Sequence, residues 1–181
     1  VIRHAITSPD GKTLVFNAAG YLYKKSLPNG KPQRITNATE FEFEPSFTPN
    51  GNEIVYVTWS DDEMGAIKRV GLNGRNPVTL TKEKSIYRNP AVSSDGRMIV
   101  YTKESGNSDQ GRTFTKEPGI YIMNASGENA RKLTTEGDFP TFSKNNDRIF
   151  YQTGGMFMGN LTKRLKSVDL IGHDDRTQVE Y

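Results

Sequence analysis

The sequence predicts an all-β fold: a β-propeller, or a fragment of one, with four four-stranded antiparallel blades. Two observations predict it. A turn rich in Asp, Asn and Gly recurs four times, and its marker residues lie 40, 45 and 50 residues apart, at Asp10, Asn50, Asp95 and Asn145. Each turn leads into a strand that is apolar on both faces, and no segment keeps a helical period over two turns. Repeats of this length are typical of blades that stack face to face and cover both sides of each sheet.

The first strand of each copy comes just before the turn. We expect these strands at 5–7, 45–47, 90–93 and 140–143, with Pro45, Pro90 and Pro140 as their first residues. Proline is tolerated at the start of a strand because its missing N–H falls outside the ladder. The turn itself is Asp-Gly or Asn-Gly in three copies, a strong hairpin signal.

The remaining strands follow in order. The second strands are the apolar runs 14–16, 54–56, 99–101 and 149–151, and the third strands are expected at 20–23, 66–70, 119–123 and 165–168. A second glycine turn precedes the fourth strand of each copy. These strands are expected at 33–36, 78–81 and 131–134, with a weaker strand signal near 176–179. These elements place the blades at 1–39, 40–84, 85–135 and 136–181.

Composition excludes several classes of function. The net charge is +3 from 24 basic and 21 acidic residues with the signs interspersed, so no nucleic-acid surface is expected. With no cysteine there are neither disulfides nor thiolate metal sites. No apolar run approaches the roughly 20 residues that span a bilayer, so we expect no membrane insertion. Because the chain starts at Val1 without a leader, it is expected to be a processed or truncated piece.

The motifs resemble a known repeat family. A Pro-x-Phe-Ser/Thr-Pro-Asp-Gly pattern, an aliphatic-aromatic strand, Ile-Tyr-Ile-Met-Asn-x-x-Gly and Arg-Lys-Leu-Thr are similar to the PD40 (WD40-like) repeat of TolB-type propellers. The resemblance covers essentially the whole chain. The fourth copy departs from it, with Asn145-Asn146 in place of Asp-Gly and an insertion before its third strand.

The resemblance implies a bacterial protein, periplasmic or exported, that binds protein partners. Similar blades also precede catalytic domains in prolyl-oligopeptidase-like peptidases and in some amidohydrolases, and the segment 165–176 looks most like the amidohydrolase kind. The leading hypothesis is therefore a non-catalytic module for protein–protein interaction or domain organisation. The alternative is the propeller portion of a larger hydrolase with its active site outside this chain, and a third interpretation is a propeller that binds a small ligand.

Candidate binding residues are expected where the blades vary. The two glycine turns of each blade lie at one end of its sheet. The long insertions, expected at 59–63, 103–117 and 153–164, and the blade-to-blade connections, expected at 40–44 and 85–88, lie at the other. Long loops on a rigid scaffold are where binding usually occurs. The candidates at this loop-rich end are Trp59, Asp61, Asp62, Glu42, Glu44, Tyr87, Arg88 and Phe157.

Other motifs point to no chemistry. His173-Asp174-Asp175 falls in a glycine turn, and the one other histidine is His4, whereas a metal site needs several convergent ligands. We therefore expect no catalytic residue, no metal and no cofactor in this chain. Four whole blades with no closing strand would leave bare apolar faces on blades one and four. This predicts either that the chain self-associates through those faces or that it is part of a longer chain.

Overall fold

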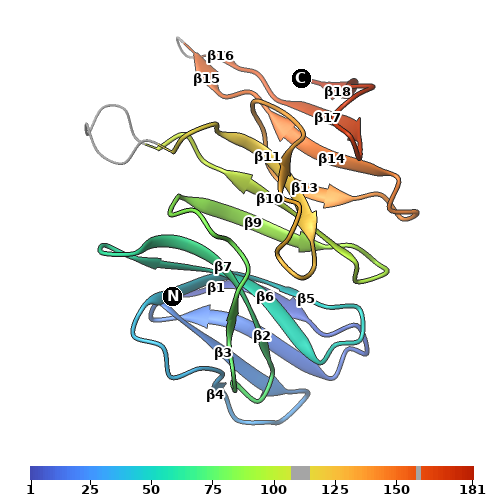
Figure 1. The fold of residues 1–181 in the computed structure, drawn as a ribbon. Helices are drawn as coiled ribbons and strands as arrows, with labels where there is room; N and C mark the ends of the chain where they lie inside the picture. Colours follow the sequence, from blue (N-terminus) through green and yellow to red (C-terminus); the bar gives the residue numbers. More distant parts are fainter. Residues whose placement is uncertain (107–114, 158–159) are drawn as a thin grey trace. The chain divides into compact units, whose positions relative to one another are not determined.

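The computed structural model describes residues 1–106, 115–157 and 160–181 and confirms the all-β prediction (Figure 1). Its strands form four four-stranded antiparallel sheets and one two-stranded hairpin. The chain divides into two compact units, Val1–Lys84 and Ser85–Tyr181, each of which holds two of the four large sheets. Within the described ranges, no helix could cross a lipid bilayer.

The first unit contains two sheets in simple up-and-down order. The first sheet runs β1(Ile2–Thr7), β2(Thr13–Ala18), β3(Tyr21–Ser26) and β4(Gln33–Arg34), and the second runs β5(Phe41–Phe47), β6(Glu53–Ser60), β7(Met64–Gly71) and β8(Val78–Thr79). The two sheets enclose one apolar core, formed by Val15, Leu22, Ile35, Ile54, Tyr56 and Val70. Stacking of the sheets thus buries the apolar second strands, as the continuous hydrophobic runs predicted.

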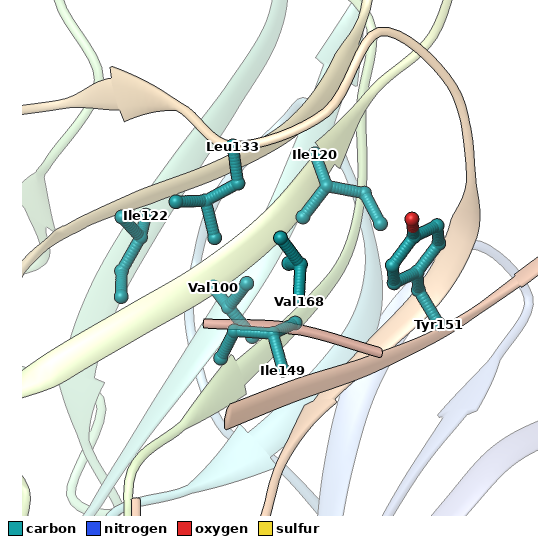
Figure 2. Close-up of a cluster of buried hydrophobic side chains, with 7 residues drawn as sticks. All are labelled: Val100, Ile120, Ile122, Leu133, Ile149, Tyr151 and Val168. Atoms are coloured by element: carbon teal, nitrogen blue, oxygen red, sulfur yellow. The ribbon is translucent and has the colours of Figure 1, made fainter. Parts of the chain in front are cut away.

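The second unit repeats this arrangement. Its sheets are β9(Tyr87–Val92), β10(Met98–Lys103), β11(Gly119–Asn124) and β12(Arg131–Lys132), followed by β13(Asp138–Phe142), β14(Arg148–Thr153), β17(Arg164–Asp169) and β18(Arg176–Glu180). The insertion between β14 and β17 contains the hairpin of β15(Met156–Phe157) and β16(Asn160–Leu161). Figure 2 shows the core between the two sheets, where Val100, Ile120, Ile122 and Leu133 meet Ile149, Tyr151 and Val168.

The recurring turn is held by the same hydrogen bonds in its copies. The Ser8 hydroxyl donates to the Asp10 carboxylate at 2.6 Å, and that carboxylate accepts the Lys12 N–H at 3.0 Å. Ser93 and Asp95 repeat the contact at 2.6 Å, and Thr48 with Asn50 makes it at 2.8 Å. The hydrogen bonds from Ser8 and Ser93 lower the pKa of Asp10 and of Asp95, respectively, below the ordinary value.

The fourth turn forms the same geometry with different residues. Asn146 takes the left-handed conformation (φ 56°) that Gly11, Gly51 and Gly96 adopt in the other copies, and Asp147 accepts the Ser143 hydroxyl at 2.5 Å. Asn146 also reaches the third turn, where its amide group donates to the Ser94 hydroxyl at 2.7 Å and accepts the Ser94 N–H at 3.0 Å. The departure of copy four from Asp-Gly therefore adds a link between two sheets.

The first strands differ from the prediction in one respect. They begin before the prolines, at Phe41, Tyr87 and Asp138, and each proline lies inside its strand. In all four sheets the ladder shifts by one residue, so that two residues of the first strand lie opposite one aromatic residue of the second. Those aromatic residues are Phe16, Tyr56, Tyr101 and Tyr151. This is a β-bulge, where a proline removes no ladder hydrogen bond.

The lengths of the fourth strands, at the sheet edges, also differ from the prediction. The fourth strands β4, β8 and β12 are only two residues long, and the one expected to be weakest, β18, has five residues. The outer faces of the first and last sheets are of mixed character, and on the last sheet Leu165 and Val179, which lie opposite each other, are 38% and 39% exposed. On the first sheet Phe16 is 6% exposed and stacks on Tyr23, and on the last sheet Arg148 and Gln178 cover Ser167 with hydrogen bonds.

Candidate binding surface

Three of the predicted binding residues lie where β6 turns into β7. Trp59 is in the last part of β6, and only residues 61–63 form the turn, so the connection is shorter than expected. Asp61 and Asp62 are exposed, and the Trp59 indole N–H donates to the Asp61 carboxylate at 3.2 Å. The structure thus brings an aromatic ring and an acidic turn together at one point of the first unit.

Further aromatic residues extend from Trp59. Phe41 lies directly opposite Trp59 on the neighbouring strand, and its ring centroid is 6.3 Å from that of Tyr21 and 6.3 Å from that of Phe43. We call Tyr21, Phe41, Phe43 and Trp59 the aromatic row. Phe41 is 49% exposed, and the other three side chains are half-buried. An exposed apolar group with a polar rim is typical of a surface that contacts another molecule.

Glycine at position 20 makes room for the row. Gly20 has φ +85°, and a Cβ atom there would lie 2.6 Å from the Phe41 ring. The Gly20 carbonyl also accepts the Glu42 N–H at 2.8 Å, which fixes the start of β5. The exposed side chain of Phe41 was not predicted, because residues 40–44 were expected to form a connection and instead belong to β5. The alternation of Phe41-Glu42-Phe43-Glu44 was the available signal, since strict alternation indicates a strand with two different faces.

Glu42 is a structural residue, and its placement in a loop was wrong. Its side chain is fully buried in β5 and accepts the Leu22 N–H at 3.0 Å and the Thr36 hydroxyl. Its carbonyl accepts the Asn17 side chain at 2.5 Å. Glu42 thus joins the second sheet to the first, because a buried carboxylate is tolerated where donors satisfy it.

Glu44 occupies the bulge of its strand, also inside β5. It is 7% exposed with φ 49°, and its carboxylate lies 3.9 Å from the imidazole Nε2 of His4, the equivalent bulge residue of β1. In the second unit the equivalent residues are Asn89 and Phe139, with φ 51° and 53°. A left-handed conformation at one position of all four sheets is uncommon for residues other than glycine. It shows that the bulge geometry is imposed by the ladder.

Tyr87 and Arg88 lie in β9, not in a connection. Tyr87 is 3% exposed and packs edge-on against Tyr101 with ring centroids 5.7 Å apart, and Arg88 pairs with Glu104 at 3.1 Å. Both contacts stabilise the third sheet. Phe157 lies in β15, but its side chain is outside the described residues, as are positions 107–114 of the insertion expected after Lys103.

Two cavities lie at the same end of their sheets as these residues. In the first unit a cavity of ≈ 270 Å³ is lined by the ion pairs Lys68–Glu40 and Lys84–Glu63. In the second unit a cavity of ≈ 350 Å³ is lined by Lys103, Glu104, Glu136 and Asp138 among others. Their linings are polar and of mixed charge, so they provide hydrogen-bonding groups and no apolar enclosure.

The described residues contain no group of three or more His, Cys, Asp or Glu side chains placed to hold a metal ion. The acids next to His173 serve the fold. Asp174 pairs with Arg176 and Arg148, which lower the pKa of Asp174, and Asp175 accepts the Tyr151 hydroxyl at 2.9 Å and pairs with Lys166 at 2.6 Å. Burial, followed by the hydrogen bond to Asp175, raises the pKa of Tyr151.

No protein-family model matches the chain. Curated relatives include the Tol-Pal system protein TolB of Francisella tularensis, 32% identical over 90 residues (50% of this chain and 19% of that protein). TolB of Helicobacter hepaticus is 27% identical over 165 residues (80% and 35%). A UDP-N-acetylenolpyruvoylglucosamine reductase of Nostoc is 28% identical over 135 residues (74% and 38%). The chain thus spans well under half of the length of these relatives.

Solved structures agree on the fold. TolB from Acinetobacter baumannii matches 98% of this chain and 43% of its own, with a TM-score of 0.73 and 19% identity. An oligogalacturonate lyase in complex with manganese matches 98% of this chain and 53% of its own, with a TM-score of 0.74 and 15% identity. At these identities the likeness shows the fold alone.

Proposed function

We propose, from the premise that this chain is a TolB-like β-propeller, that it is a non-catalytic module for protein–protein interaction. The observation that carries the proposal is the aromatic row. Its Phe41 side chain is 49% exposed and lies opposite Trp59, which leads into the acidic turn at Asp61 and Asp62. Aromatic residues in a partly desolvated setting with a polar rim are the usual energetic centre of protein interfaces. The name of the TolB relatives, Tol-Pal system protein, supports a role in an assembly.

A photo-crosslinking amino acid at position 41 tests the proposal in cells of the source organism. We expect a discrete adduct with another protein when the crosslinker replaces Phe41. The matched control places it at Ile171, which is 61% exposed in a turn of the second unit. Equal adducts from both positions, or adducts from neither, would refute the proposal.

The same cells test two further points. A periplasmic or exported location, which the TolB resemblance implies, predicts that the chain fractionates with periplasmic or secreted proteins. The alternative, a propeller portion of a larger hydrolase, predicts that the complete reading frame encodes a catalytic domain. Sequencing that reading frame distinguishes the interaction module from this alternative.

A further inference from the structure

The aromatic row presents ring faces to which a cation is attracted. Phe41 and Trp59 are directly opposite on antiparallel strands, which brings their Cβ atoms to within about 5.5 Å of each other. The Tyr21 ring is also close to Phe41, with ring centroids 6.3 Å apart. The face of an aromatic ring is electrostatically negative, so a positive group placed over it is stabilised.

One guanidinium group already uses this row. The Arg34 guanidinium lies 3.6 Å from the centroid of the Tyr21 ring, held there by a hydrogen bond to the Ala38 carbonyl. The contact shows that the row accepts a stacked guanidinium on its Tyr21 end. Phe41, the next ring, is the most exposed member of the row.

The rim of the row next to Trp59 is acidic. Asp61, Asp62 and Glu63 follow the end of β6, and the Trp59 N–H holds the Asp61 carboxylate at the edge of the indole ring. Glu63 pairs with Lys84, which leaves the turn with a net negative charge although the chain as a whole carries +3. Ring faces and carboxylates together select a positive group and disfavour a negative one.

We propose that Phe41 and Trp59, with Asp61 and Asp62, bind an arginine side chain in an exposed segment of the protein partner. Arginine fits better than lysine because its planar guanidinium stacks on a ring while its N–H groups donate to a carboxylate. The inference rests on the proposed interaction function and specifies the partner's chemistry.

Trp59 is the one tryptophan in the sequence, so its fluorescence reports on this surface directly. The probe is the acetylated, amidated peptide Ser-Arg-Ser-Arg-Ser. We compare it with the same peptide carrying citrulline, which keeps the shape of arginine without its charge, and with a lysine version. We expect a saturable change of Trp59 fluorescence with the arginine peptide, weaker binding of the lysine peptide, no response to citrulline, and weaker binding at high salt.

Three variants locate the effect. Phe41→Leu keeps an apolar side chain without a ring and should weaken arginine-peptide binding about three- to thirtyfold. Asp62→Asn should weaken it severalfold, whereas Glu128→Gln, the same charge change at an exposed site in the second unit, should leave it unchanged. Circular dichroism checks that each variant is folded.

The proposal is overturned if citrulline binds as well as arginine, if Glu128→Gln weakens binding as much as Asp62→Asn, or if Trp59 does not respond to the arginine peptide. Crosslinks at position 41 without arginine binding would reject the cation preference and keep the interaction function. Absence of both would reject both.

Discussion

Replacing Glu42 separates the contributions of its charge and of its hydrogen bonds to the link between the first two sheets. In Glu42→Ala, the buried Leu22 N–H and Thr36 hydroxyl lose the carboxylate that accepts them. Hydrogen bonds to a charged group contribute about 1.5–3 kcal/mol each, and removing the buried charge recovers part of its desolvation cost. We therefore expect the free energy of unfolding to fall by about 2–4 kcal/mol.

Glu42→Gln should cost less, about 1 kcal/mol, because the amide oxygen still accepts the Leu22 N–H while the amide NH₂ donates to the Thr36 oxygen. Two other sheets show which group could accept the Leu22 N–H when the carboxylate is absent. Thr81 and Thr134 accept the equivalent N–H groups of Ile67 and Ile120 with their hydroxyls, at 3.0 Å and 3.3 Å. In Glu42→Ala the Thr36 hydroxyl could take the same role, which sets the lower end of the expected range.

Urea unfolding followed by Trp59 fluorescence measures these changes, because Trp59 lies in the same unit as Glu42. Glu128→Ala, an exposed glutamate in the second unit, is the control and should change stability by less than about 0.5 kcal/mol. A loss below about 0.5 kcal/mol in Glu42→Ala would refute the reasoning, since Glu42 would then not link the sheets. A Gln variant as unstable as the Ala variant would show that the charge is what matters.

Three further predictions follow from the turns. Because hydrogen bonds lower the folded-state pKa of Asp10 and Asp95, their stabilisation is complete above the ordinary pKa of about 3.9 and is lost as pH falls through the lower folded value. Asp10→Asn, which has the residue of the second repeat, should therefore reduce the loss of unfolding free energy as pH falls, measured by urea titrations between about pH 2 and 6. Gly74→Ala should destabilise the chain far more than Gly11→Ala, although both glycines have a positive φ. An added Cβ at Gly74 would lie 1.7 Å from the Ile35 carbonyl oxygen, whereas one at Gly11 would have no atom within 4 Å. Equal losses of melting temperature in the two variants would contradict this. Asn146→Ala should cost more than Asn146→Gly, because both lose the Ser94 bonds and only alanine strains the left-handed turn, by about 1–2 kcal/mol in thermal unfolding.

The repeating strands and turns were predictable because local chemistry decides them. The Asp-Gly turn needs a left-handed residue and an acceptor side chain, and both are visible in the sequence at Asp10-Gly11. The apolar runs such as Ile54-Val55-Tyr56 predicted sheets covered on both faces, and these three residues are at most 1% exposed. The order of the four strands in each sheet followed from the same repeat.

The residue environments that were not predicted depend on contacts with residues distant in the sequence. The sequence around Glu42 resembles an acidic loop, and its structural role depends on hydrogen bonds from Leu22 and Thr36. Tyr87 looks like a connection residue, and its burial against Tyr101 appears only once β9 and β10 pair. Phe41 was hidden for the same reason, because its exposure beside Trp59 depends on the register of β5 with β6.

The bulge in every first strand has a consequence for anyone who edits this chain. Phe43 pairs with Val57 before the bulge and Ser46 pairs with Val55 after it, so odd-numbered positions share a face on one side of the bulge with even-numbered positions on the other. Deleting a single bulge residue would therefore turn one half of the strand over, sending its inward side chains to solvent and its outward ones into the core. Repeats can be exchanged between blades only with this extra residue kept.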